Sequence, residues 1–123
     1  MARNESQFWY YLKKNTPTIK WTRIENTSSL GTPDLLGYNS NNHFFTLELK
    51  VVRSGNKIKF SPHQISFHMR HPIGTYILVD DAVRARVCFY FGNQIDDLVK
   101  NGLKTKPKAE TLEDCKKFLD KLN

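Results

Sequence analysis

Hydrophobic and polar residues alternate over residues 43–52, which read His-Phe-Phe-Thr-Leu-Glu-Leu-Lys-Val-Val. Such a period of two predicts a strand with one apolar face. The face expected to meet the core carries Phe45, Leu47, Leu49 and Val51, and the opposite face carries Phe44, Thr46, Glu48 and Lys50. Glu48 and Lys50 therefore point the same way, about 7 Å apart at roughly 3.3 Å of rise per residue.

A shorter apolar segment precedes this strand. Gly31 and Pro33 open it, and residues 34–38 read Asp-Leu-Leu-Gly-Tyr. Residues 39–42, Asn-Ser-Asn-Asn, form a tight connection to the next strand. The pattern predicts a hairpin of 34–38 and 43–52, which brings Asp34 next to Glu48.

The rest of the chain alternates between helical and strand periodicity. We expect helices at 4–15, 62–71, 93–101 and about 111–122, strands at 19–24, 76–79 and 87–91, a joining loop at 80–84 and a linker at 104–109. At 123 residues the chain is long enough for one domain, 1–123, with a core over about 4–101. The elements predict an α/β (α+β) fold with a mixed central sheet flanked by helices.

The hairpin gathers two carboxylates and a lysine. Magnesium prefers oxygen ligands, usually one or two carboxylates with water and substrate phosphate. Asp34, Glu48 and the backbone carbonyl of Leu49 supply such ligands, and Lys50 would position the attacking water or stabilise charge at phosphorus. The alternative is a surface hairpin with an ordinary Glu–Lys pair.

The residues Gly31-Thr32-Pro33-Asp34-Leu35, Glu48-Leu49-Lys50 and Gln64, in this order, resemble the PD-(D/E)xK nuclease superfamily. The closest likeness is to its small stand-alone VRR-NUC-type and Holliday-junction-resolvase-like members, over about residues 5–91. The resemblance implies a restriction-endonuclease-like core of order αβββαβ, with the metal site at one edge of the sheet. It also implies a Mg²⁺-dependent (or Mn²⁺-dependent) endonuclease that acts on DNA, often as a homodimer on branched or flapped substrates.

Two further positions match the family outside the central motif. Many members carry an acidic residue on the first helix, and here the match is Glu5, a further candidate metal ligand. The alternative is a first-turn glutamate favoured by the helix dipole. Gln64 matches a glutamine that related nucleases place near the scissile phosphate. Ser61-Pro62 also makes Gln64 part of a helix capping box, and we expect that one rotamer cannot fully serve both roles.

The charge pattern indicates an anionic partner. The net charge is +7 and the pI is near 9.5. A basic loop, Arg53-Ser54-Gly55-Asn56-Lys57, directly follows the Glu-x-Lys strand. A polar loop at 25–31 precedes the hairpin. The candidate DNA contacts are Ser29, Arg53, Lys57, Lys59 and His68. The alternatives are solvated loops and, for His68, an ordinary surface histidine.

Other features limit the setting of the protein. No segment is long and apolar enough to span a membrane, and no signal peptide is seen. Cys88 and Cys115 suggest neither a disulfide framework nor a zinc site, so an intracellular setting is expected. The compact size would suit a viral or mobile-element protein that acts in a host cell.

Residues 8–11 of the first helix are all aromatic and cover nearly every side of it. One helix cannot bury all of them against a single sheet, so we expect some to face a partner. A homodimer interface is the preferred use, and stacking on unpaired bases is the second.

Two other functions stay open. A sequence-specific restriction-type nuclease is disfavoured because the chain has little room for a separate recognition domain. A non-catalytic nucleic-acid-binding module of the same fold is disfavoured because Asp34, Glu48 and Lys50 are all present.

Overall fold

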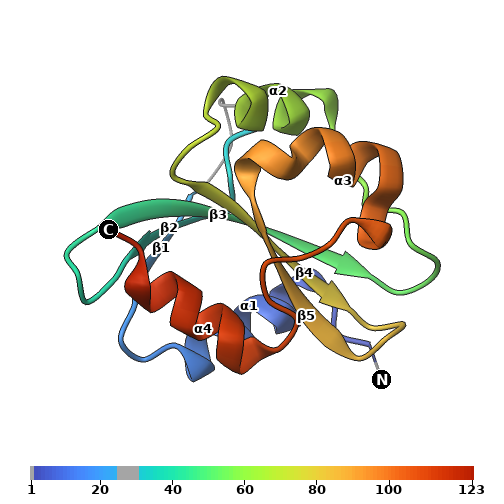
Figure 1. Ribbon diagram of the computed structural model, residues 1–123. Coiled ribbons are helices and arrows are strands. Elements are labelled where there is room, and N and C mark those ends of the chain that lie inside the picture. The colour runs from blue at the N-terminus through green and yellow to red at the C-terminus, as the bar shows by residue number, and fades with distance from the viewer. Residues whose placement is uncertain (1, 25–30) are drawn as a thin grey trace.

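The computed structural model describes residues 2–24 and 31–123, which form a five-stranded sheet with helices on both faces (Figure 1). In chain order the elements are α1 (Glu5–Asn15), β1 (Lys20–Arg23), β2 (Leu35–Tyr38), β3 (Phe44–Val52), α2 (Pro62–Arg70), β4 (Thr75–Asp81), β5 (Arg86–Phe91), the 3₁₀ turn η1 (Gly92–Gln94), α3 (Ile95–Asn101), the 3₁₀ turn η2 (Gly102–Lys104) and α4 (Leu112–Lys121).

The strands lie in the order β1-β2-β3-β4-β5. Only β3 and β4 run parallel, and α2 makes the crossover between them. The predicted hairpin is confirmed, because β2 and β3 pair antiparallel through the turn at 39–42. The α+β class and the mixed sheet flanked by helices are confirmed as well.

The polar residues that precede the helices explain where these begin. The Asn4 side chain accepts from the Gln7 backbone N–H, and the Gln7 side chain accepts from the Asn4 backbone, so α1 opens on a capping box. Thr111 accepts from the backbone N–H of Asp114 and starts α4. Of the helices in the described residues, none has the length and apolar character needed to cross a membrane.

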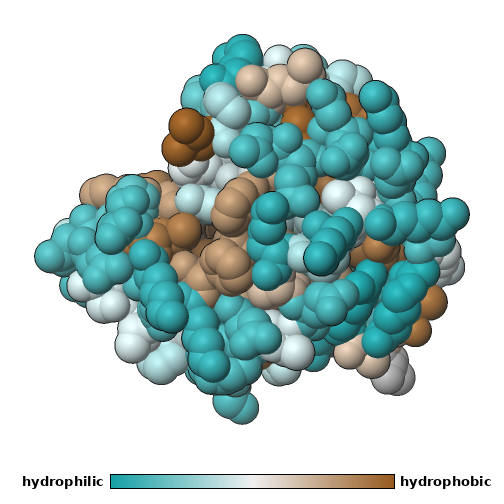
Figure 2. Space-filling view, in the orientation of Figure 1, coloured by the Kyte–Doolittle hydropathy of each residue, from teal (hydrophilic) through white to brown (hydrophobic). Residues whose placement is uncertain are grey.

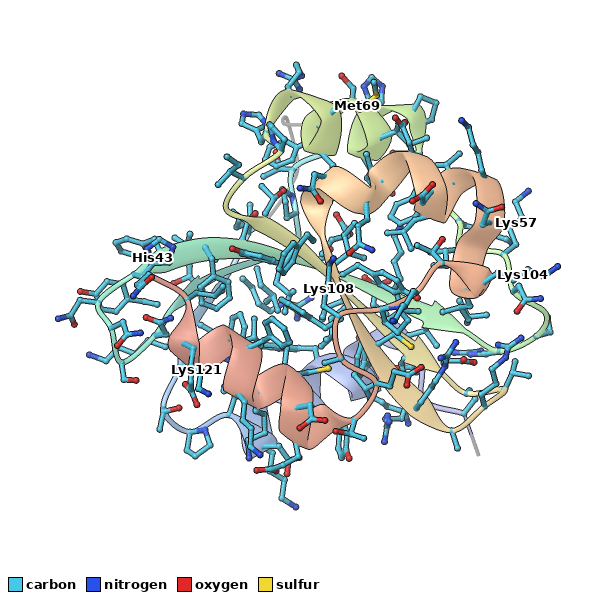
Figure 3. All side chains as sticks on the ribbon, in the orientation of Figure 1. His43, Lys57, Met69, Lys104, Lys108 and Lys121 are labelled. Carbon is cyan, nitrogen blue, oxygen red and sulfur yellow. The ribbon has the colours of Figure 1, made fainter. Side chains whose placement is uncertain are left out.

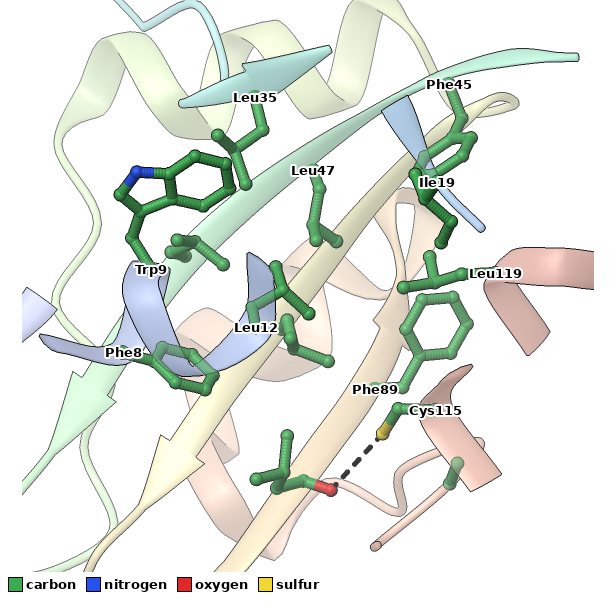
Figure 4. Packing of buried hydrophobic residues seen from close by; sticks show 14 residues of the cluster. Phe8, Trp9, Leu12, Ile19, Leu35, Phe45, Leu47, Phe89, Cys115 and Leu119 are labelled. Atoms are coloured by element: carbon green, nitrogen blue, oxygen red, sulfur yellow. Dashed lines mark hydrogen bonds between the residues drawn. The ribbon is translucent and has the colours of Figure 1, made fainter. Parts of the chain in front are cut away.

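Two hydrophobic clusters sandwich the sheet. The larger lies between the sheet and the helices α1 and α4, and the smaller lies between the sheet and α3, with α2 beside it (Figure 1). Figure 4 shows how the larger cluster packs, with Phe8, Trp9 and Leu12 of α1 facing Leu47 of β3. The alternation of β3 is therefore confirmed, because its odd-numbered residues 45–49 are buried in this cluster.

The expected loop at 80–84 starts too early. Asp80 and Asp81 belong to β4 and are buried. Asp80 accepts from the guanidinium of Arg3, and Asp81 accepts from those of Arg84 and Arg86. These ion pairs satisfy the carboxylates, so both residues can stay in the strand.

The expected linker at 104–109 is mostly irregular and joins η2 to α4, but it also packs on the sheet. Its end pairs with β5, because the N–H of Phe89 donates to the Ala109 carbonyl at 2.9 Å. The N–H of Lys108 returns a bond to the Phe89 carbonyl at 2.8 Å. The segment therefore protects the outer edge of β5 near the start of α4.

The aromatic residues of α1 are accommodated better than the sequence suggested. Phe8 and Trp9 are buried, and the Tyr11 ring packs 3.9 Å from the guanidinium carbon of Arg3. Tyr10 alone of the four stays well exposed, at 73%. The expectation that one helix cannot bury all four is confirmed for Tyr10, but Tyr11 is half-buried and packs on Arg3, so the homodimer prediction loses most of this support.

Gly102 allows η2 to dock on the loop that follows β3. Its φ is 55°, and a Cβ atom here would overlap the backbone carbonyl of Asn56. Gly55 offers a matched control, because its φ is 64° but nothing lies within 4 Å of the added atom.

We expect Gly102→Ala to lower the free energy of unfolding by at least about 3 kcal/mol, from backbone strain and steric overlap together. Gly55→Ala should cost only about 1 kcal/mol, from strain alone. Urea denaturation of both variants measures the difference. Equal losses would show that η2 does not pack closely on this loop.

Candidate active site

The pairing of β2 with β3 places the two candidate carboxylates side by side. Leu35 lies opposite Leu47, so the next position places Asp34 opposite Glu48. Asp34 Oδ2 accepts a 2.8 Å hydrogen bond from the backbone N–H of Leu49. The predicted proximity of Asp34 and Glu48 thus comes from one continuous antiparallel register.

Glu48 is buried although it is acidic, with 1% of its surface exposed. Burial raises the pKa of its carboxyl far above the ordinary value, and the neighbouring Asp34 carboxylate acts in the same direction. Its Oε2 accepts from the Gln64 amide at 3.3 Å. Its Oε1 is buried with no hydrogen-bond partner in the described part of the chain. A buried carboxyl oxygen without a partner is costly when it is ionised. The group therefore either keeps its proton or needs a cation beside it.

Gln64 connects the acid pair to the lysine. Lys50 Nζ donates to Gln64 Oε1 at 2.8 Å and also lies 5.0 Å from the centre of the Phe60 ring. The same Oε1 accepts from the backbone N–H of Ser61 at 3.0 Å, which completes the capping box of α2. One rotamer of Gln64 thus combines the cap with the contact to Lys50, because one amide oxygen has two lone pairs, and its role near a phosphate stays a prediction.

Glu5 approaches the acid pair from α1. It lies in the first turn of the helix and lines a cavity of about 260 Å³ together with Asp34 and Leu49. Partial burial raises the pKa of the Glu5 carboxyl, and the charge of Asp34 raises it further. Both interpretations of Glu5 therefore describe its position, since it suits the helix dipole and also lies near the predicted site.

The oxygen atoms at this point fit a hard divalent cation. Asp34 and the unpartnered Oε1 of Glu48 supply carboxylate oxygens. The N–H and C=O of one residue point to the same edge of a strand, so the Leu49 carbonyl faces the side on which Asp34 lies. Residues 2–24 and 31–123 contain no group of three or more His, Cys, Asp or Glu side chains arranged for a metal. An ion here would therefore be held by two carboxylates, a carbonyl and water, as magnesium often is.

Basic side chains surround a hollow beside Glu5. A cavity of about 440 Å³ is lined by Glu5, Lys50, Arg53, Lys57 and Lys59, among others. The last three of these are exposed, so their charges face solvent. The arrangement can accept phosphate groups next to the carboxylates.

The structure places His68 differently from the prediction. Its side chain is fully buried, so it lies neither on the surface nor within reach of DNA. Its Nδ1 lies 3.2 Å from the hydroxyl of Thr75, and burial together with the charge of Lys50 lowers the His68 pKa to about 4. The histidine is therefore neutral and belongs to the packing of α2 on β4. The candidate Ser29 lies outside the described residues.

Sequence reasoning missed two neighbours of the site. Phe60 supports Lys50, and Arg23 lines the same cavity as Asp34 and acts on the pKa of Glu5. The sequence could have indicated Arg23, because it is two residues from Trp21 and therefore lies on the same face of the strand as Trp21. Phe60 had none, since it lies in an irregular segment between β3 and α2.

No protein-family model, curated protein or solved structure matches this chain. The family resemblance therefore depends on Asp34, Glu48, Lys50 and Gln64 themselves.

The raised pKa of Glu48 leads to a prediction about stability. The folded protein holds this proton up to a higher pH than the unfolded chain does, so the free energy of unfolding falls as pH rises above the ordinary glutamate pKa. Glu48→Gln removes the titrating group. In EDTA, we expect the variant to gain at least about 1.4 kcal/mol on the wild type between pH 4 and pH 9, the equivalent of one pKa unit.

Urea denaturation at several pH values measures this gain. Glu113→Gln serves as the control, because the Glu113 side chain is 69% exposed. A constant difference between wild type and Glu48→Gln across the pH range would contradict the burial of an uncompensated carboxyl group.

Proposed function

We propose that this chain is a metal-dependent endonuclease that hydrolyses phosphodiester bonds in DNA, preferentially branched or flapped DNA. One observation carries the proposal: the buried Glu48 lies opposite Asp34, with one carboxyl oxygen unpartnered among the described residues. Burying such a group is costly, and binding a cation would offset the cost.

The residues have separate roles in this proposal. Asp34, Glu48 and the Leu49 carbonyl would hold Mg²⁺ or Mn²⁺, with Glu5 close by. The bound ion supplies a water of lowered pKa and neutralises charge at phosphorus. Lys50, fixed by Gln64 and Phe60, presents a cation to the phosphate or its attacking water.

Gln64 acts as a positioning residue. It holds Lys50 by its oxygen and Glu48 by its nitrogen, so a base and an acid keep a fixed separation. Since its oxygen also caps α2, the geometry depends on the start of a helix and not on a free side chain. Such preorganisation suits stabilisation of charge that develops during the reaction.

The fold and charge agree with this class of enzyme. The order α1-β1-β2-β3-α2-β4 supports a restriction-endonuclease-like core of the PD-(D/E)xK type. The net charge of +7 and the cations of the 53–59 loop support a DNA partner. A homodimer would place two sites across a symmetric junction. The two cysteines are buried and form no disulfide, which suits an intracellular setting.

Cleavage assays with Mg²⁺ on junction, flap and linear duplex DNA test the proposal. We expect Asp34→Ala and Glu48→Ala to abolish cleavage while DNA binding survives or improves, because repulsion of phosphate falls. Lys50→Ala should lose orders of magnitude in rate. Glu113→Ala, which removes an exposed acid, should cleave normally.

The outcomes separate the candidate functions. Cutting confined to junctions or flaps supports the proposal, and site-specific duplex cutting would assign a restriction-type enzyme. Tight binding without cutting would assign a non-catalytic module. Cleavage that persists in Asp34→Ala or Glu48→Ala would remove the metal assignment.

The basic loop gives a second test. Replacing Arg53 and Lys57 by Gln should weaken duplex binding and reduce the salt slope by about 2, since each phosphate contact contributes roughly 0.9. Replacing Lys14 and Lys20, which are exposed on α1 and β1, should leave the slope nearly unchanged. Fluorescence anisotropy over a range of salt concentrations measures both. An unaltered slope in the loop variant would place the DNA path elsewhere.

A further inference from the structure

A groove of about 550 Å³ lies between the end of β5 and α4. Figure 2 shows its surroundings as a pale brown patch at the centre of the face, bordered by hydrophilic side chains. Its lining includes Phe91, Lys108, Asp114, Lys117, Phe118 and Lys121. In Figure 3, Lys108 lies near the centre and Lys121 toward the lower left, whereas Lys57 of the basic loop lies at the right edge.

Two aromatic rings form the apolar part of the groove. Phe91 and Phe118 are half-buried, and their ring centres lie 6.2 Å apart at 78°. Both rings pack on Phe89, which is fully buried, at 6.0 Å and 5.2 Å. This packing holds both rings in place. A planar group could therefore stack on one of them without the entropy cost of fixing the side chain on binding.

The border of the groove is positively charged. Three exposed lysines stand against one aspartate. Lys108 Nζ lies 5.0 Å from the centre of the Phe91 ring, and the only ion pair recorded between these lining residues joins Lys117 to Asp114 at 4.0 Å, with both side chains at least 60% exposed. Exposed pairs of this kind contribute little, so most of the positive charge is available to a ligand.

Flat aromatic rings beside exposed lysines match the two parts of a nucleotide, its base and its phosphate. A base stacks on aromatic side chains, and its phosphate is attracted by lysine. A duplex offers no free base faces, because its bases are already stacked on each other. An apolar helix of a partner protein would have to approach the lysines without compensating their charge.

We infer that this groove takes an unpaired base of single-stranded DNA, stacked on the Phe118 ring with Phe91 beside it, and with its phosphates beside Lys108, Lys117 and Lys121. The inference rests on the proposed function for the identity of the partner, and it adds a second contact that is separate from the carboxylate pair. Phe91 lies beside Tyr76 on the α4 face of the sheet, whereas Glu48 faces Gln64 on α2.

The test measures binding of fluorescently labelled single-stranded oligothymidine and of blunt duplex DNA in EDTA, by anisotropy. Phe118→Leu keeps an apolar side chain but removes the ring, and we expect it to weaken single-strand binding by about fivefold or more. Lys117→Gln with Lys121→Gln should reduce the single-strand salt slope by about 1.4. Duplex binding should change by less than about twofold in either, while Arg53→Gln with Lys57→Gln should show the reverse selectivity.

Each outcome decides the inference. Unchanged single-strand affinity in both groove variants overturns it, provided that their circular dichroism matches the wild type. Polyglutamate that binds as tightly as the oligonucleotide, with no effect of Phe118→Leu, would assign the groove to an acidic protein and also overturns it. The binding assay contains no metal, so weaker single-strand binding in the groove variants supports the groove even if no substrate is cleaved. Cleavage by a protein whose groove variants bind single strands normally would support the proposed function alone.

Discussion

The site depends on the burial of the Glu48 carboxyl group against Asp34, at the open end of the β2–β3 hairpin. Side chains alternate across a strand, so a register slip of one residue would turn Glu48 and Lys50 toward α1. The apolar residues on the other face of β3 prevent this slip, because they would then leave the larger core cluster. Packing on one face therefore holds a costly acidic group in place on the other.

Gln64 links this strand to α2. Its oxygen accepts from the helix start and from Lys50, and its nitrogen donates to Glu48. The first turn of the helix and the position of the lysine are consequently one structural unit. A change that weakens the cap at Ser61 should disturb the lysine as well, although the two are distant in the sequence.

Local patterns predicted much of this structure. The alternation around Glu48 predicted the strand and its two faces, and Ser61 marked a helix start because capping is a short-range interaction. Long-range partners were not readable. Asp80 looked like part of a turn, yet it pairs with Arg3, 77 residues away. His68 looked polar and exposed, yet Thr75 and the helix packing bury it. The same limit hid Phe60, since no period governs an irregular segment.

Two surfaces that differ in chemistry thus lie at different places on the sheet, one where Asp34 and Glu48 meet at β2 and β3, the other between β5 and α4. One combines carboxylates with a basic hollow, and the other combines aromatic rings with lysines. A domain of this size has a radius of gyration of roughly 14 Å, whereas duplex DNA resists bending over about 150 base pairs. A straight duplex on the first surface would need a costly bend to reach the second. An unpaired strand turns at every nucleotide, so a substrate with a duplex arm and a free strand could occupy both. That geometry agrees with branched or flapped DNA as the proposed substrate.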